Sequence, residues 1–233
     1  TLSSRAGAPS AAAGPPEGRS GVQPADPRLE QAAAALGAAV IGWRRALLWL
    51  VLAIPAALMI QRFASGEALA MDLYHPSGEM SVRLMILALL PGPLTDALGP
   101  NRFLRGWLAI RRNLGVAAFL YALRHLGFYV LDMQLVSAMV GELAIPGIWT
   151  GWLALALLLV PAAISFDAAM RRLGRRWKQI QRLVYPAFLL ALIHWLLLDW
   201  AWGPALVHLA PLLVAWTLRM VMRRRTIVTR SIA

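Results

Sequence analysis

The chain has 233 residues, of which 59% are hydrophobic, and its mean hydropathy is +0.61. It carries 23 basic and 11 acidic residues, a formal net charge of +12, and it contains no cysteine. Soluble domains are nearer half apolar, and a chain without cysteine forms no disulfide, iron–sulfur cluster or thiolate metal site. Because the arginines cluster between apolar runs, the basic excess indicates membrane headgroups and not nucleic acid.

The amino-terminal segment, residues 1–38, is rich in Ala, Gly, Pro and Ser and has no apolar periodicity. This composition predicts a disordered tail. The segment does not read as a signal peptide, because no apolar core follows a basic start. We expect residues 39–222 to form the membrane domain and residues 223–233 to form a short basic tail.

Six apolar segments follow in chain order. A helix that crosses a hydrocarbon core of about 30 Å needs roughly 20 apolar residues. The candidate spans are Ala46–Ile60, Val82–Leu98, Asn113–Leu131, Leu143–Phe166, Gln181–Leu198 and Trp200–Leu218. The sequence therefore predicts an all-α integral membrane bundle of about six transmembrane helices.

Charge alternates sharply between the connecting segments. Basic residues follow the second and fourth spans and the sixth: Arg102, Arg105, Arg111 and Arg112, then Arg171, Arg172, Arg175, Arg176, Lys178 and Arg182, then Arg219, Arg223, Arg224, Arg225 and Arg230. The loops after the third and fifth spans hold only acidic residues, namely Asp132, Glu142 and Asp199. The positive-inside rule therefore predicts that both termini are cytoplasmic, which requires an even number of spans.

Two histidines lie inside predicted spans, where ionisable residues are costly and mark functional candidates. His125 lies 13 residues after Arg112, and His194 lies 12 residues after Arg182. Both are therefore roughly 18–20 Å from the cytoplasmic face, in the outer half of the bilayer. Two imidazoles at one depth can ligate one haem iron from opposite sides. A proton relay, a quinone contact or a structural hydrogen bond between helices would also explain them.

Three further ionisable residues are weaker candidates. Arg124 needs an anion, which could be a haem propionate, the carboxylate of Asp132 or the outer headgroups. His75 falls in the first outer loop, where we expect it to be solvated. His208 lies near the outer end of the last span, where interfacial exposure competes with contact to a haem or a quinone headgroup.

Two stretches of the chain resemble a known family. One is Arg111-Arg112-Asn113-Leu114-Gly115 with Phe119–Leu126 and Tyr129, and the other is Arg172–Lys178 with Arg182–Tyr185 and His194-Trp195. They resemble the MsrQ (YedZ) family, the haem-binding membrane subunits of bacterial periplasmic methionine sulfoxide reductase systems. The resemblance covers about residues 40–222. It places the chain within the wider group of ferric-reductase-like transmembrane domains.

The resemblance implies a b-type cytochrome in the bacterial inner membrane, with His125 and His194 at the positions of haem ligands. Its partner would be an MsrP-like periplasmic molybdoenzyme, and its electrons would come from quinol or from a cytoplasmic flavin reductase. FMN has also been associated with the family. The chain would be an electron-transfer subunit of an oxidoreductase system and not a complete enzyme, because it has no apparent flavin or nicotinamide domain of its own.

Gln181 departs from the family pattern. The family usually has a histidine at this position, 13 residues before His194, which is thought to serve a haem nearer the cytoplasm. Since glutamine is a poor iron ligand, we expect one outer haem and not two. The departure favours quinol as the donor. It also leaves open a haem-free alternative, in which the chain is a structural or assembly subunit of a larger membrane complex.

Overall fold

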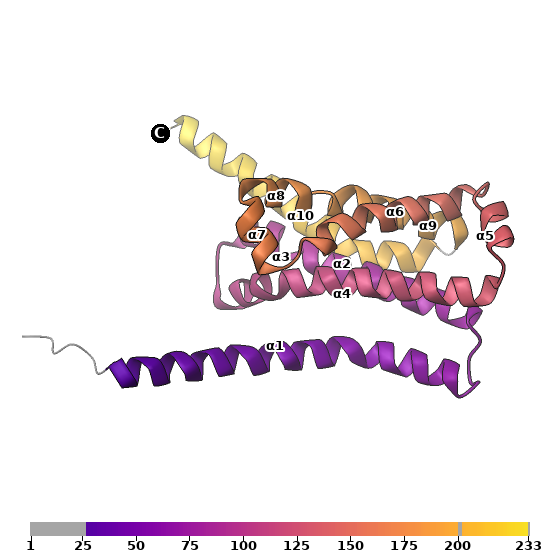
Figure 1. Ribbon diagram of the computed structural model, residues 1–233. Helices are drawn as coiled ribbons and strands as arrows, with labels where there is room; N and C mark the ends of the chain where they lie inside the picture. Colours follow the sequence, from indigo (N-terminus) through magenta and orange to yellow (C-terminus); the bar gives the residue numbers. More distant parts are fainter. Residues whose placement is uncertain (1–26, 200–201, 233) are drawn as a thin grey trace, which may run out of the picture. The chain divides into compact units, whose positions relative to one another are not determined.

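The computed structural model describes residues 27–199 and 202–232, and divides into two units, residues 1–47 and residues 48–233 (Figure 1). The first helix, α1 (Pro27–Ala64), begins in the first unit and continues into the second. Residues 27–38, which the sequence assigns to a disordered tail, are therefore helical. Alanine, the strongest helix former, is frequent in this stretch. The rest of that predicted tail, residues 1–26, lies outside the described part of the chain.

The second unit contains a short 3-10 turn and nine further helices among the described residues. They are η1 (Met71–Leu73), α2 (Tyr74–Leu89), α3 (Pro91–Leu98), α4 (Arg102–Met133), α5 (Val136–Glu142), α6 (Pro146–Ala163), α7 (Asp167–Leu173), α8 (Arg175–Gln181), α9 (Val184–Leu198) and α10 (Trp202–Ile232). Within the described residues, six helical segments are long and apolar enough to cross a membrane. The predicted all-α bundle of six spans is confirmed, and the chain is a multi-pass membrane protein.

Several boundaries differ from those expected, and the third span, for example, begins at Arg102 and not at Asn113. The second span begins at Met71 and not at Val82, because η1 and α2 continue the helix outward through residues that the sequence suggested were a loop. The expectation of a loop at His75 is therefore wrong, since this residue lies in the first turn of α2. At the other end, α10 continues to Ile232, through most of the predicted basic tail.

Local chemistry explains where several helices begin and end. The Asn101 side chain accepts a hydrogen bond from the Leu104 amide at 2.8 Å and so caps the start of α4. Gln134 ends α4 with a φ of 57°, a left-handed conformation. Pro91 and Pro146 stand at the first positions of α3 and α6, where a missing amide proton costs nothing. Gly174, with a φ of 50°, separates α7 from α8.

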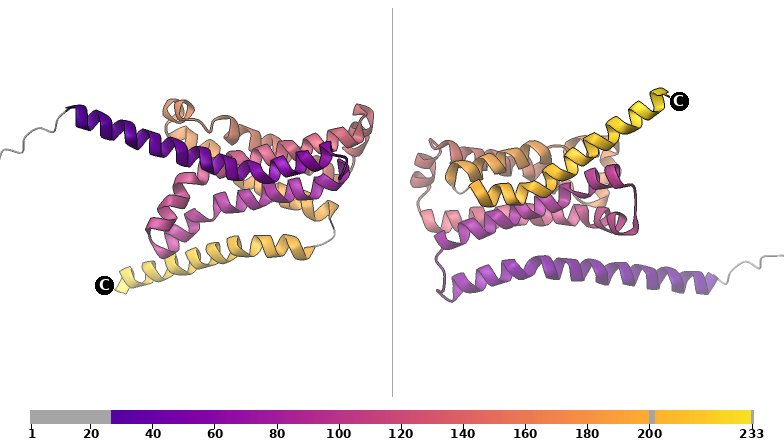
Figure 2. Two further views of the ribbon diagram at one scale, coloured as in Figure 1. Left: turned by 90° about the horizontal axis from the view of Figure 1, so that it is seen from below. Right: turned by 180° about the vertical axis from the view of Figure 1, so that it is seen from behind.

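The core of the second unit is built from two helix pairs, α2 with α4 and α6 with α9 (Figure 2). Small residues allow α2 and α4 to approach closely: Ala117, Ala118 and Ser77 are almost fully buried. The Ser81 hydroxyl donates a hydrogen bond of 2.8 Å to the Ala118 carbonyl across this contact. Large apolar side chains elsewhere point outward, as expected for surfaces that face lipid.

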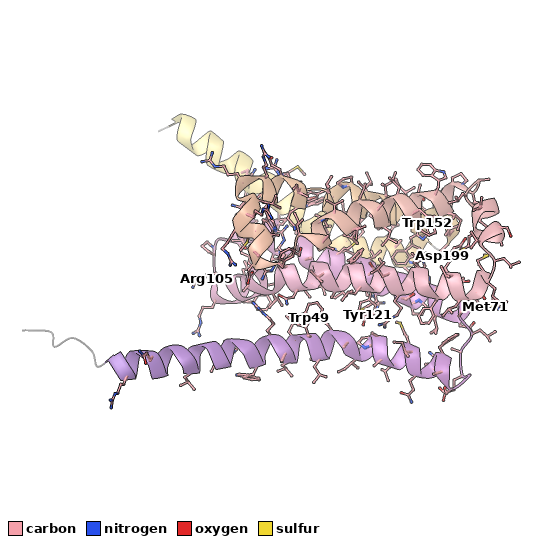
Figure 3. All side chains as sticks on the ribbon, in the orientation of Figure 1. Trp49, Met71, Arg105, Tyr121, Trp152 and Asp199 are labelled. Atoms are coloured by element: carbon pink, nitrogen blue, oxygen red, sulfur yellow. The ribbon has the colours of Figure 1, made fainter. Side chains whose placement is uncertain are left out.

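The two ends of this unit differ in charge. Arg105 lies at one end of the bundle, whereas Met71 and Asp199 lie at the other (Figure 3). At the basic end, Arg112 forms an ion pair of 2.5 Å with Asp167, and Arg219 forms one of 2.7 Å with Asp96. The carboxylates at the opposite end are bound by neutral phenols, since Tyr74 donates to Asp132 and Tyr129 donates to Glu142. The end with Arg105 is called the basic end below, and the other end the acidic end.

Candidate haem site

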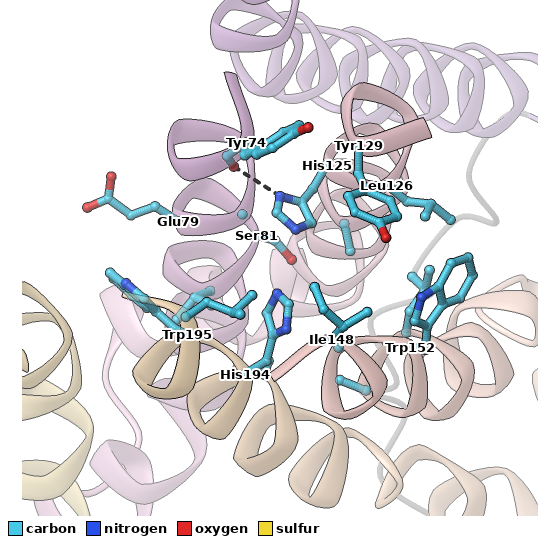
Figure 4. Close-up of a pocket in the computed structure, with 18 of the residues that line it drawn as sticks. Tyr74, Glu79, Ser81, His125, Leu126, Tyr129, Ile148, Trp152, His194 and Trp195 are labelled. Carbon is cyan, nitrogen blue, oxygen red and sulfur yellow. Dashed lines mark hydrogen bonds between the residues drawn. The ribbon is translucent and has the colours of Figure 1, made fainter. Parts of the chain in front are cut away.

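The structure brings the imidazoles of His125 of α4 and His194 of α9 close together near the acidic end, with their ring planes nearly perpendicular. Their ring centroids are 5.8 Å apart, and their planes are inclined by 85°. Figure 4 shows the two imidazoles pointing toward each other across a cavity. The sequence predicted that the two histidines lie at the same depth, and in the structure they are also neighbours.

Each imidazole is oriented by a backbone carbonyl. His125 Nδ1 lies 3.0 Å from the Tyr74 carbonyl oxygen, and His194 Nδ1 lies 2.6 Å from the Gly147 carbonyl oxygen. A carbonyl oxygen can only accept, so Nδ1 of each ring carries the proton and donates it. In the neutral imidazole the lone pair is then on Nε2, the atom left for a metal. Histidine ligands of metals are commonly held in this way.

Two glycines make room for the rings. A Cβ atom at Gly151 of α6 would lie 2.5 Å from His194 Nδ1, and one at Gly78 of α2 would lie 3.1 Å from His125 Nδ1. The first distance is a severe clash and the second a tight contact. The backbones of α6 and α2 therefore approach the imidazoles as closely as they do because these positions lack side chains.

The cavity between the histidines, called the histidine cavity below, has a volume of about 470 Å³ and is lined by α2, α4, α6 and α9. This volume falls in the range of about 300–1,000 Å³ that small molecules and cofactors occupy. Apolar residues form part of its wall, including Val82, Met85, Leu158 and Ala187. Tyr74, Glu79, Tyr129, Glu142 and Asp199 also line it.

The geometry fits a porphyrin iron with two axial imidazoles. Metal–imidazole bonds are about 2 Å long, so two imidazoles on one metal have centroids roughly 6 Å apart, close to the observed 5.8 Å. Among the described residues, no group of three or more His, Asp or Glu side chains could hold a bare metal ion. A porphyrin supplies four equatorial nitrogens itself, so a pair of histidines is sufficient for it.

Arg124 does not line the histidine cavity. Its guanidinium lies 5.2 Å from the centroid of the Tyr121 ring, and it lines a separate cavity of about 110 Å³ with Trp49 and Leu52 of α1. Its NH1 atom is buried and has no hydrogen-bond partner among the described residues. Asp132, which the sequence offered as a partner, accepts from Tyr74 instead. The pairing of Arg124 with a haem propionate stays a prediction.

The other candidates of the sequence also have definite partners. His75 Nδ1 lies 3.5 Å from Asp199 Oδ2, and the residue lines the histidine cavity. His208 contacts Arg83 and Glu79. Gln181 donates through Nε2 to the Pro161 carbonyl at 3.0 Å and lies 3.3 Å from Ser165 Oγ. The amide therefore joins α8 to α6 at the basic end, in the position where the family pattern has a histidine.

Sequence reasoning missed four residues of the site: Tyr74, Gly78, Glu79 and Gly151. The first three lie in a stretch that was assigned to a loop. Gly151 offered a weak signal, as a residue without a side chain in an uncharged span. The carbonyls of Tyr74 and Gly147 carry no sequence signal at all, because any residue supplies a carbonyl.

Comparison with known proteins agrees with this site. The family model described as ferric reductase like transmembrane component matches residues 77–192, a segment that contains His125 and ends two residues before His194. The fold, the helix order and this match define the class of the protein, a membrane component of the ferric-reductase-like type.

Individual relatives narrow the class to one family. The protein-methionine-sulfoxide reductase heme-binding subunit MsrQ of Brucella anthropi is 36% identical over 166 residues, which cover 69% of this chain and 73% of the relative. The subunits of the same name from Brucella ovis and Brucella canis are each 34% identical over 179 residues, covering 74% of this chain and 79% of each relative. The chain belongs to the MsrQ family.

Proposed function

We propose that this chain binds one haem b between His125 and His194 and carries electrons through the membrane to a methionine sulfoxide reductase partner. The observation that carries the proposal is the pair of imidazoles with both Nδ1 atoms held by backbone carbonyls. The names of the relatives describe haem-binding subunits of that reductase system, which supports the choice of cofactor and partner.

In this proposal the chain's own residues do three things. His125 and His194 would hold the iron of a bound haem through Nε2, and the carbonyls of Tyr74 and Gly147 keep both rings in the tautomer that can ligate. Apolar residues such as Met85 and Leu158 exclude water from the face of the ring system. A haem bound here would supply a one-electron carrier, whose potential depends on its axial ligands and burial.

The expected orientation puts the basic end in the cytoplasm of a bacterium and the histidine cavity toward the periplasm. A periplasmic MsrP-like molybdoenzyme would then meet the acidic end. Gln181 supports quinol over a cytoplasmic flavin reductase as donor, since its amide is already engaged with Pro161 and no second histidine stands at its level. The 13 residues from Gln181 to His194 span roughly 20 Å of helix.

FMN has no part in the proposal. The separate cavity lined by Arg124, Trp49 and Leu52 has a volume of about 110 Å³, well below the roughly 300 Å³ at which ligand pockets begin. The histidine cavity is the larger of these two cavities, and the imidazoles of His125 and His194 beside it support haem as the cofactor.

The test is the absorption spectrum of the purified chain and of its histidine variants. We expect a low-spin b-type spectrum that is lost in both His125→Ala and His194→Ala and kept in His75→Ala. Adding a quinol under anaerobic conditions should reduce the bound haem, whereas a cytoplasmic flavin reductase with its nicotinamide should reduce it more slowly. A spectrum that survives either of the first two substitutions would contradict the ligand assignment.

A further inference from the structure

A second polar cluster lies within the spans, at the contact of α2 and α10. Arg83 donates through Nε to His208 Nε2 at 2.8 Å and through NH2 to Glu79 Oε1 at 2.7 Å. His208 Nε2 also lies 3.2 Å from Glu79 Oε1. These three residues are called the α2–α10 triad below. The sequence offered His208 alone as a candidate, for interfacial exposure or for contact to a haem or a quinone headgroup.

The triad lies where lipid-soluble molecules can reach it. Arg83 is near the middle of the span Met71–Leu98, yet its side chain is 45% exposed. The side chains of His208 and Glu79 are 21% and 17% exposed. A half-exposed guanidinium at this depth is costly, and such residues mark functional sites by default. Among the described residues, Arg83 NH1 makes no hydrogen bond, so it can donate to a ligand.

His208 is placed so that it can act as donor or acceptor without moving. Its Nδ1 lies 2.6 Å from the Pro204 carbonyl and therefore donates to it. Its Nε2 stands between a donor, Arg83 Nε, and an acceptor, Glu79 Oε1. The neutral ring accepts from the guanidinium, and the protonated ring donates to the carboxylate. The triad thus places a hydrogen-bond donor, the Arg83 guanidinium, beside an acceptor, the Glu79 carboxylate.

We propose that the α2–α10 triad binds the polar ring of a membrane-soluble quinone and its hydroquinone. The hydroxyl of the reduced ring would donate to the Glu79 carboxylate, and the carbonyl of the oxidised ring would accept from Arg83, while His208 holds the Arg83 guanidinium in place. The triad offers both an acceptor for the hydroquinone hydroxyl and a donor for the quinone carbonyl, so it suits both forms of the ring. This inference rests on the proposed function, because it locates where the quinol donor would dock.

The triad adjoins the histidine cavity. Glu79 belongs to both, since it also lines that cavity. The Trp195 ring lies 5.8 Å from the His208 ring, and Trp195 is the neighbour of His194 in the chain. Figure 4 shows the Glu79 side chain extending from α2 away from the two imidazoles. A ring bound at the triad would therefore lie beside the histidine cavity, outside the space between the imidazoles.

The test is calorimetric titration of the purified full chain with decylubiquinone in detergent micelles. We expect Glu79→Gln and His208→Phe each to weaken binding by about tenfold or more, the loss that follows from removing one charge-assisted hydrogen bond. Glu67→Gln is the matched control, because Glu67 is an exposed carboxylate in the turn after α1, outside the triad. The control should bind decylubiquinone as the unmodified chain does.

A second measurement guards against variants that fold poorly. An azido-quinone photolabel applied to the unmodified chain should attach to residues 79–86 of α2 or residues 204–212 of α10. Labelling elsewhere, or equal affinity in Glu79→Gln, His208→Phe and the control, would show that the triad is only an ion pair between helices. Haem content, measured on the same samples, tests the proposed function separately, because quinone binding does not require a bound haem.

Discussion

At the scale of single residues, the site depends on two glycines that leave room for the imidazoles. Gly151→Ala adds a methyl group 2.5 Å from His194 Nδ1, which is too close for the ring to keep its position. We expect this variant to lose most of its bound haem, although alanine is otherwise favoured over glycine in a helix. Haem per chain, measured on purified protein, checks this.

The glycines also provide their own controls. Gly78→Ala should lower haem content less than Gly151→Ala, because its added Cβ lies 3.1 Å from the neighbouring ring atom. Gly127→Ala should change nothing, since no atom lies within 4 Å of a Cβ at that position. Equal haem content in all three variants would mean that the imidazoles do not hold the cofactor in the observed geometry.

Gln181 allows a test of the number of haems. We expect Gln181→His to leave the ratio at one haem per chain. The residues of α4 at this level are Arg111 and Arg112, which are basic and cannot ligate iron, and Arg112 is paired with Asp167. A doubled haem content in this variant, determined from absorbance and protein mass, would show that a second axial ligand exists.

Sequence reasoning found the two histidines because depth in a membrane follows from counting residues along a helix. It could not find the partners of their Nδ1 atoms. Whether Tyr74 and Gly147 meet the imidazoles depends on the rotation of α2 and α6 about their axes, which only side-chain packing decides. For the same reason it could not tell that Asp132, one of the three anions it offered to Arg124, accepts from Tyr74 and that the guanidinium lies over the Tyr121 ring.

At the scale of elements, the pairing of α2 with α4 positions His125 against the Tyr74 carbonyl. Ser81→Ala removes the hydrogen bond to Ala118 that joins the two helices. We expect a loss of about 1 kcal/mol in the free energy of unfolding, the usual value of one such bond. Unfolding in mixed micelles with increasing denaturing detergent measures it.

Thr217→Ala is the matched control for this measurement. The Thr217 hydroxyl bonds to the Leu213 carbonyl within α10, so its removal breaks no contact between helices. The control should unfold as the unmodified chain does. If both variants are equally stable, the α2–α4 hydrogen bond does not contribute to the fold.

The helix ends show why the second span was predicted too short. Hydropathy fell between Met71 and Met80, where Asp72, His75 and Glu79 interrupt the apolar run. In the structure Asp72 accepts a hydrogen bond from the Leu69 amide, and His75 lies close to Asp199. Glu79 lies close to His75 and to His208 of α10, so the helix continues through these polar residues. The polar stretch that lowered the hydropathy is the stretch that lines the site.

At the scale of the whole molecule, the six spans follow from composition, because each span must satisfy its backbone within itself. Their direction stays a prediction of the positive-inside rule. The absence of cysteine makes the direction testable with single introduced thiols. We expect Glu67→Cys to react with a membrane-impermeant maleimide applied to intact spheroplasts. Arg172→Cys should react only after the membrane is opened. The reverse pattern would overturn the orientation and place the histidine cavity near the cytoplasm.

The central claim is that this bundle holds one haem b between His125 and His194. A pyridine haemochrome assay on the chain purified from haem-replete cells tests it most directly. The account predicts one haem b per chain. A stable, colourless preparation would contradict the account and leave His125 and His194 as a structural pair that joins α4 to α9.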